Sequence, residues 1–216
     1  STLRRHAALA RRHRALVRAV ATSAIREARN GPDVVRRVRR ETGISLEVVS
    51  GREEARLICL GVLHGRPARQ RSLLVDIGGG STEIALAAGE RPSLLLSVAI
   101  GSVRLTETFD SSGRVDAERL ALMRSFAAEA LERSLPRFAH PRHALGSSGT
   151  IGSVVSFASE GGGRQVSRKR VRKAVRALAR MRLEERRRVL EGADAVKGEI
   201  QDALHAVDWE ALPGRI

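Results

Sequence analysis

The most constraining feature of the sequence is the segment at residues 73–83, LLVDIGGGSTE. Its apolar run predicts a strand, the three consecutive glycines predict a tight turn, and the residues that follow predict a second strand. Glycine lacks a Cβ, so the backbone of such a turn can gather its N–H groups into a concavity that accepts a phosphoryl group. We call this candidate phosphate site the glycine loop, and it consists of Gly78, Gly79, Gly80, Ser81 and Thr82.

A carboxylate stands at each edge of the glycine loop. The first strand delivers Asp76 to the turn, and the second brings Glu83 back beside it. Two carboxylates next to a phosphate site suit Mg²⁺, which prefers a few carboxylates together with phosphate oxygens and water. The alternative is an ordinary glycine hairpin with an incidental Asp. The loop is not a P-loop, because no Gly-Lys followed by Ser or Thr comes after it.

A second candidate element is SGREEAR, at residues 50–56. Ser50 with Glu53 three residues later predicts a capping box at the start of a helix. Glu54 has no such structural task and is free to orient and deprotonate a water molecule, although alone it would be a solvated helix residue. Arg56 either pairs with an acid or contacts a phosphate, and both alternatives stay open.

The third element is LGSSGTI, at residues 145–151. Small residues between a predicted strand and a predicted helix let a ligand approach the backbone, and a helix N-terminus favours anions. The alternative is a tight strand-to-helix turn. The candidate phosphate contacts in this third loop are Gly146, Ser147, Ser148, Gly149 and Thr150. Two weaker candidates, ATSAIR at residues 21–26 and GSVR at residues 101–104, each place an Arg near a strand end.

The order of predicted elements favours an α/β fold with a mixed sheet. Strands and helices alternate up to a polar segment at residues 64–71, which is a candidate hinge between two lobes. Three strand-like runs then follow one another, at residues 72–77, 82–88 and 93–100, and predict an antiparallel meander. Helical patterns dominate the remainder, including a basic stretch at residues 167–190.

The charge of +15 is unevenly distributed. Residues 1–40 carry a net +10, residues 41–163 carry −1 and residues 164–216 carry +6. Basic flanks indicate either solvated Arg-rich helices or a track for a polyanion, because phosphate chains bind Arg well. Four Phe, one Trp and no Tyr leave few aromatic rings for base stacking, which disfavours nucleic acid as a partner.

Two further observations bear on the cellular setting. No apolar stretch approaches the roughly 20 residues of a membrane helix, so we expect no membrane partner. The single Cys59 excludes a disulfide within the chain and a cysteine metal site, which fits a reducing compartment, and we expect the cytoplasm.

Five segments taken together resemble the exopolyphosphatase / guanosine pentaphosphate phosphohydrolase family. Their order and spacing match over about residues 2–158, and the combination of SGREEAR, DIGGGSTE and GSVRLTE is much more specific than any one motif. A single motif would indicate only the broader actin, sugar-kinase and chaperone ATPase superfamily. The segments are VRAVATSAIREA, EVVSGREEARLICLGV, LLVDIGGGSTEIAL, IGSVRLTETF and ALGSSGTI.

The resemblance implies an actin-like (ribonuclease H-like) fold with two lobes, Mg²⁺ dependence and hydrolysis of terminal phosphate from polyphosphate or guanosine pentaphosphate. It assigns Glu54 as the catalytic glutamate and Asp76 and Glu83 as metal-side carboxylates. The glycine loop and the third loop become phosphate loops, and Arg56 is retained as a phosphate contact. Dimers are common in the family, so the resemblance implies a homodimer.

The sequence departs from the family pattern at both ends. The chain starts after the family's D-x-G-S-N-S type loop, and residues 160–216 match poorly. We therefore expect a partial first lobe at residues 1–66, a second lobe at 67–160 and a basic helical segment at 161–216. We also expect a truncated chain with weak or absent activity of its own.

The competing hypothesis is a non-catalytic remnant that binds polyphosphate or a nucleotide. An ATP-using sugar kinase is disfavoured, because the SGREEAR helix has no role there.

Overall fold

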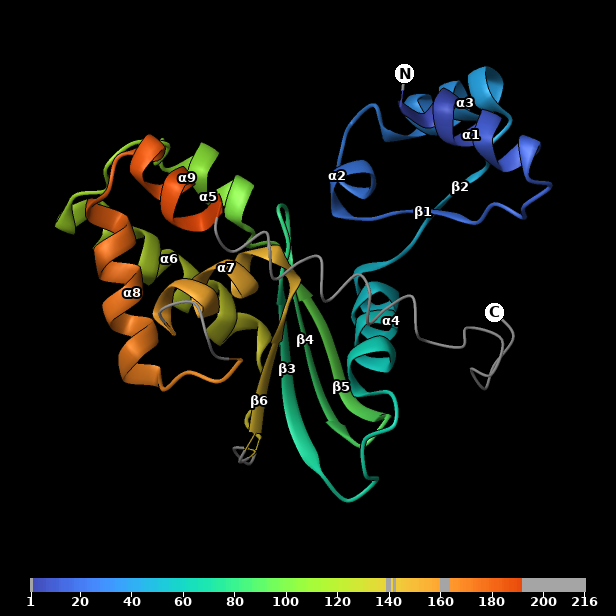
Figure 1. Cartoon of the computed structure of the whole chain (residues 1–216). Coiled ribbons are helices and arrows are strands. Elements are labelled where there is room, and N and C mark those ends of the chain that lie inside the picture. The colour runs from blue at the N-terminus through green and yellow to red at the C-terminus, as the bar shows by residue number, and fades with distance from the viewer. Residues whose placement is uncertain (1, 139–140, 142, 160–163, 192–216) are drawn as a thin grey trace. The chain divides into compact units, whose positions relative to one another are not determined.

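The computed structural model describes residues 2–138, 141, 143–159 and 164–191 (Figure 1). These residues fall into two compact units. The first unit runs up to Arg104 and includes Ala128–Gly146. The second contains Leu105–Ala127 and the chain from Ser147 onward. The predicted segments 1–66, 67–160 and 161–216 follow a different division, which stays a prediction.

The N-terminal part of the first unit is a small α/β arrangement. Strands β1 and β2 pair in parallel, with Ala19 opposite Leu46. Helices α1 and α3 pack around a small core of Ala7, Val38 and Ile44. The elements are α1 (Thr2–Arg12), β1 (Ala19–Ala21), α2 (Ser23–Arg26), α3 (Gly31–Thr42) and β2 (Leu46–Val48).

The main sheet of the first unit has four strands in the order β5-β4-β3-β6. Both the β3–β4 and the β4–β5 pairs are antiparallel, which confirms the predicted meander. Helix α4 packs against β4 and β5, and Cys59 and Leu63 of this helix lie in the core with Leu74 of β3. The elements are α4 (Gly51–Leu63), β3 (Arg71–Ile77), β4 (Thr82–Ala88), β5 (Arg91–Val98) and β6 (His143–Ser147).

The segment predicted as a hinge, residues 64–71, lies inside the first unit and is tied to the β4–β5 turn. Glu90 Oε1 accepts from the Gly65 N–H at 2.8 Å and lies 3.3 Å from His64 Nδ1. The Gly89 N–H donates to the Gln70 carbonyl at 3.0 Å. These contacts connect α4 to the far end of the sheet from the glycine loop.

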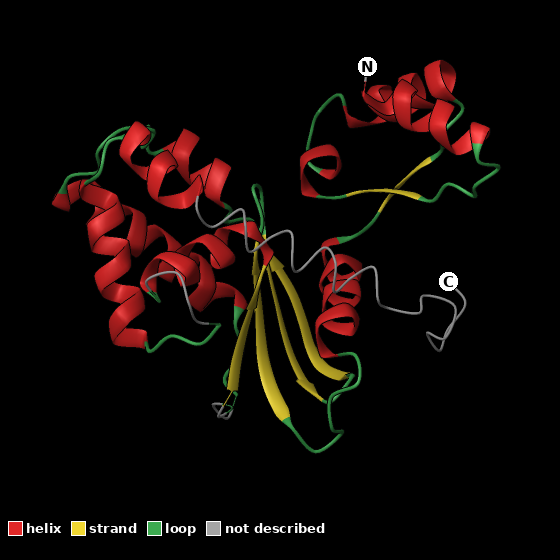
Figure 2. Cartoon of the chain, viewed as in Figure 1, coloured by secondary structure: helices red, strands yellow, loops and turns green. Residues whose placement is uncertain are grey.

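The second unit consists mainly of helices in the part that the structure describes (Figure 2). Helix α7 packs against α8 and α9, and the rings of Phe109 and Phe126 meet edge to face at 5.5 Å. The basic stretch predicted at residues 167–190 forms two helices, because the backbone is extended at Met181. The helices are α5 (Ser102–Thr108), α6 (Ala117–Ser134), α7 (Ser148–Ala158), α8 (Arg168–Arg180) and α9 (Leu183–Glu191), of which α5 and α6 begin or end in the first unit.

Parts of the poorly matching segment 160–216, at residues 160–163 and from residue 192 onward, lie outside the described residues. No helix among the described residues is long and apolar enough to cross a bilayer.

Candidate functional site

The first turn of α4 holds two successive glutamates in different environments. Ser50 caps the helix, and its Oγ accepts from the Glu53 N–H at 3.1 Å, as predicted. The Glu53 carboxylate accepts from Arg56 Nε at 2.8 Å and Nη2 at 2.7 Å. This hydrogen-bonded ion pair lowers the pKa of Glu53. Of the two alternatives for Arg56, the structure therefore forms the ion pair with an acid.

Glu54 points to a partner from a distant part of the chain. Arg26 Nη1 donates to Glu54 Oε2 at 2.9 Å and to the Val49 carbonyl at 3.0 Å. Both side chains are largely buried, with 13% of Glu54 and 22% of Arg26 exposed. The expectation that Glu54 is free of structural partners is wrong, because the Arg26 guanidinium fixes its carboxylate. From the sequence, Arg26 is predicted only to lie near a strand end.

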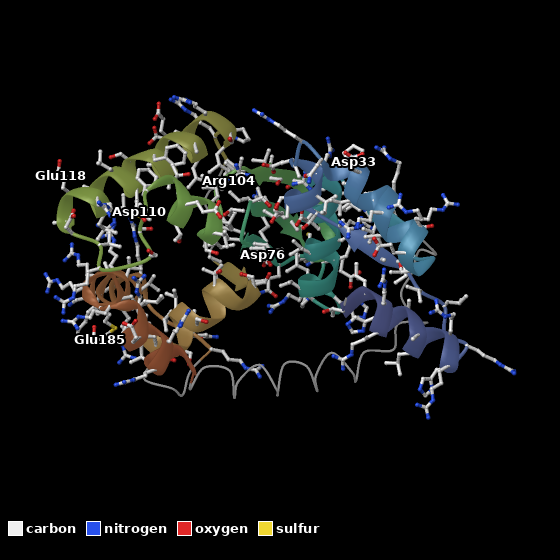
Figure 3. All side chains as sticks on the ribbon, turned by 90° about the horizontal axis from the view of Figure 1, so that it is seen from above. Asp33, Asp76, Arg104, Asp110, Glu118 and Glu185 are labelled. Carbon is white, nitrogen blue, oxygen red and sulfur yellow. The ribbon has the colours of Figure 1, made fainter. Side chains whose placement is uncertain are left out.

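The two carboxylates beside the glycine loop lie opposite each other in the sheet. Asp76 of β3 and Glu83 of β4 are register partners, and Asp76 is labelled in Figure 3. Glu83 is only 3% exposed, and its Oε1 accepts from Ser97 Oγ at 2.7 Å. Burial raises the pKa of Glu83, hydrogen bonds from Ser81 and Ser97 oppose this, and the charges of Glu54 and Asp76 raise it further. Glu54, Asp76 and Glu83 thus share one electrostatic environment.

The carbonyl oxygens of the glycine loop are bound by the first turn of α5. The Ser102 N–H donates to Gly78 O at 2.9 Å, and the Val103 N–H donates to Gly79 O at 3.0 Å. Arg104 Nε completes this arrangement by donating to Gly80 O at 2.8 Å. The carbonyls, which would repel an anion, are therefore engaged by protein donors.

The N–H groups and hydroxyls of the loop divide into two sets. The Gly78 N–H closes the turn by donating to Ser81 O at 3.0 Å. The Thr82 hydroxyl donates to the Ile100 carbonyl, and the Ser81 hydroxyl is hydrogen-bonded to Glu83. The N–H groups of Gly79 and Gly80 donate to no group of the described residues. These two amides fit the predicted anion contact, whereas both hydroxyls hold the loop together.

Glycine is needed here for close packing. None of the three glycines of the loop has a positive φ. A Cβ on Gly80 would lie 2.5 Å from Ser23 Oγ, and one on Gly101 would lie 2.3 Å from Gly79 O. Since real Cβ atoms do not approach other atoms so closely, the loop, α2 and the end of β5 can pack together only without side chains at these positions.

Helix α2 contributes more to the site than its sequence indicated. Ser23 abuts Gly80, Arg26 binds Glu54, and Glu27 forms an ion pair with Arg104. An open hollow of about 390 Å³ adjoins these contacts and is lined by Arg26, Glu27, Gly51, Arg52, Ala99 and residues 95–97. The site in the first unit thus combines α2, the start of α4, the β3–β4 turn and the start of α5.

The third loop has the geometry of a strand-to-helix turn. Gly146 is in β6, and α7 starts at Ser148, whose φ of 79° lies in the region that favours glycine. Such a conformation in a non-glycine residue costs on the order of 1 kcal/mol and is enriched at active sites and ligand-binding segments. Gly146 belongs to the first unit and Ser147 to the second, so the approach of this loop to the glycine loop stays a prediction.

Two carboxylates of the site, Asp76 and Glu83, fit a magnesium ion. The described residues contain no group of three or more His, Cys, Asp or Glu side chains in position to hold a metal. Mg²⁺ does not require one, because it is usually bound by one or two carboxylates together with substrate phosphates and water. Asp76 and Glu83, opposite each other at the turn, supply such a pair.

The four-stranded sheet, the glycine turn and the carboxylates beside it define an α/β protein. The family model described as "Ppx/GppA phosphatase family" matches residues 1–200, and the chain belongs to this family. The match confirms the family predicted from the motifs.

Individual relatives support this assignment. Exopolyphosphatase 1 of Mycobacterium tuberculosis (strain H37Rv) is 42% identical over 123 residues, which cover 54% of this chain and 35% of that protein. The matched part thus spans about a third of the length of this curated relative.

Solved structures agree with the fold. The Ppx/GppA family member from Aquifex aeolicus is 26% identical with a TM-score of 0.70, over 88% of this chain and 64% of that one. An exopolyphosphatase from Cytophaga hutchinsonii, 24% identical, has a TM-score of 0.75 over 95% of this chain and 72% of that one. These likenesses confirm the predicted fold class.

Proposed function

We propose that the chain hydrolyses terminal phosphoanhydride bonds of inorganic polyphosphate by direct attack of water. The observation that carries this proposal is the fixed carboxylate of Glu54, which Arg26 holds in the electrostatic environment of Asp76 and Glu83. The mycobacterial relative is named an exopolyphosphatase, which supports the choice of substrate. Guanosine pentaphosphate, the second substrate class implied by the sequence resemblance, carries the same type of bond.

Three groups of this chain have separate roles in the proposed reaction. Glu54 accepts a proton as the water oxygen forms a bond to the terminal phosphorus, and the bridging P–O bond breaks to release a shortened chain. The N–H groups of Gly79 and Gly80 donate to the oxygens of the transferred phosphoryl group. Arg26 is a positioning residue, because its bonds to Glu54 and to the Val49 carbonyl fix the direction of the carboxylate.

Asp76 and Glu83 would hold Mg²⁺. The ion, when bound, neutralises phosphate charge. The expected consequence for the protein is measurable without turnover, since Mg²⁺ should raise the melting temperature of the chain and lose this effect in Asp76→Asn.

Two further expectations belong to this proposal. The cytoplasm, inferred from the lone cysteine, would be the site of action. A homodimer would be the form in solution, and sedimentation would test it.

The test is phosphate release from long-chain polyphosphate with Mg²⁺, comparing the chain with Glu54→Gln. We expect Glu54→Gln to lower the rate by about 10²–10⁴-fold, the range typical of a general base. Addition of a chelator should abolish release by the unchanged chain. Release at equal rates by the two proteins would contradict the role of Glu54. Salt-sensitive binding without release by either would indicate a polyphosphate-binding protein that does not hydrolyse its ligand.

A further inference from the structure

Helix α8 is the most strongly charged element of the described structure. Its 13 residues, RKRVRKAVRALAR, contain seven basic side chains and no acidic one. All seven basic residues are exposed. None of them forms a hydrogen bond or ion pair through its side chain with another described residue.

The basic residues gather on one face of the helix. Positions spaced three, four and seven residues apart lie on the same side of an α-helix. The five residues with this spacing span about 16 Å at 1.5 Å per residue. We call them the α8 stripe, and they are Lys169, Arg172, Lys173, Arg176 and Arg180.

The clustering of like charges destabilises α8, and no acidic side chain of the described residues compensates for it. Like charges four residues apart destabilise a helix by about 0.2–0.5 kcal/mol per pair. Helix α3 is also rich in arginine, but there Arg36 pairs with Asp33 and Arg37 pairs with Glu41. No acidic side chain of the described residues pairs with the α8 stripe, whose charge is complementary to that of a polyanion.

The surroundings of the α8 stripe indicate which class of polyanion it binds. The opposite face of α8 packs against α7, with Ala174 and Ala179 buried, so no apolar face is left to enter a membrane. Neither α8 nor α9 contains an aromatic residue on which a nucleic-acid base could stack. A flexible chain of phosphates needs neither feature.

We propose that the α8 stripe binds inorganic polyphosphate as a second contact along the chain, in addition to the site that would cleave its end. The choice of polyphosphate rests on the proposed function. Because the stripe is about 16 Å long, it favours long chains over a ligand with only a few phosphates. Anchoring through several exposed cations makes this contact strongly dependent on salt.

The experiment is a binding titration of fluorescently labelled long-chain polyphosphate, followed by anisotropy with a chelator present so that no metal-dependent turnover occurs. The stripe variant is R172Q/K173Q/R176Q. The matched control is R12Q/R39Q/R40Q on α1 and α3, which removes the same number of exposed positive charges, none of them in an ion pair with a described residue. A second variant, K169Q/R180Q, changes only the ends of the stripe. The stripe variants should fold, because they remove repulsion within α8.

We expect the triple stripe variant to raise the Kd for long-chain polyphosphate at least tenfold and the end variant about threefold. The control should stay within twofold of the unchanged chain. The salt slope of log Kd should fall by about two in the triple variant, since each released counterion contributes about 0.7. Tripolyphosphate affinity should not change.

Three outcomes would overturn the proposal. They are equal weakening in the matched control, unchanged affinity in both stripe variants, and single-stranded RNA competing as well as polyphosphate of equal charge. If none of the proteins releases phosphate when Mg²⁺ is supplied, the proposed hydrolysis is contradicted. A persisting difference in Kd between the stripe variants and the control would still support polyphosphate binding by the α8 stripe.

Discussion

Two regions of the molecule use arginine in opposite ways. In the site of the first unit, Arg26 donates to Glu54 and to the Val49 carbonyl, and Arg104 donates to the Gly80 carbonyl and pairs with Glu27. In α8, the arginines are exposed and have no acidic partner among the described residues. The difference teaches that arginine content alone does not define a role. An arginine that is hydrogen-bonded to protein groups holds those groups in position. An exposed arginine without such partners keeps its charge available to a ligand.

Among the arginine substitutions, the largest expected effect comes from removing Arg26, which holds Glu54. Arg26→Gln should lower kcat for polyphosphate about 100-fold, because the carboxylate loses the donor that fixes its direction. Long-chain polyphosphate affinity should stay within twofold, since we place the long-chain contact on α8. Steady-state kinetics and anisotropy measure the two quantities. Arg29→Gln, an exposed position just after α2, is the control, and an unchanged kcat in Arg26→Gln would contradict the positioning role.

A smaller effect is expected at the arginine that holds the glycine loop. Arg104→Gln removes a hydrogen bond to the Gly80 carbonyl and the ion pair with Glu27. We expect activity to fall about tenfold, which corresponds to about 1.4 kcal/mol in the barrier. Arg104→Lys should recover only part of it, because lysine lacks the planar fork that reaches two acceptors. Equal activity of the Gln and Lys variants at the unchanged level would show that the loop does not depend on Arg104.

The smallest effect concerns stability and the buried carboxylate. The raised pKa of Glu83 means that the folded state retains its proton more readily than the unfolded state. The stabilising contribution of the protonated Glu83 carboxyl is therefore present at low pH. It is lost as the pH rises through the pKa of Glu83 in the folded state.

Glu83→Gln should remove this pH dependence and raise the melting temperature at neutral pH by about 2–4 °C, which equals about 1 kcal/mol for a chain of this size. Thermal melts from pH 4 to 8 with a chelator present check it, because Glu83 is also a proposed Mg²⁺ ligand. Ser97→Ala, which removes a hydrogen bond that opposes the shift, should move stability in the other direction. A lower melting temperature in Glu83→Gln at neutral pH would refute the account.

Local features of the fold could be predicted from the sequence. The apolar runs on both sides of the glycines predicted the antiparallel β3–β4 pair and placed Asp76 beside Glu83. The Ser50 cap was predicted because it depends on residues three apart. The motif combination also identified the family.

Contacts between distant segments could not be predicted. Arg26 and Glu54 are 28 positions apart, and no local pattern brings α2 to the start of α4. The engagement of the Gly78 and Gly79 carbonyls by α5 likewise depends on how the end of β5 returns to the turn. The partner of Arg56 stayed open because a pair three residues apart and a ligand contact have the same sequence pattern.

The central claim is that Glu54, fixed by Arg26, activates the attacking water. Glu53 is a matched control, because it is the preceding residue of the same turn but pairs locally with Arg56. The most direct measurement is phosphate release at saturating polyphosphate and Mg²⁺ by Glu54→Gln and Glu53→Gln. We predict a rate at least 100-fold lower for Glu54→Gln and a rate within about twofold of the unchanged chain for Glu53→Gln. Similar rates for the two variants would contradict the account.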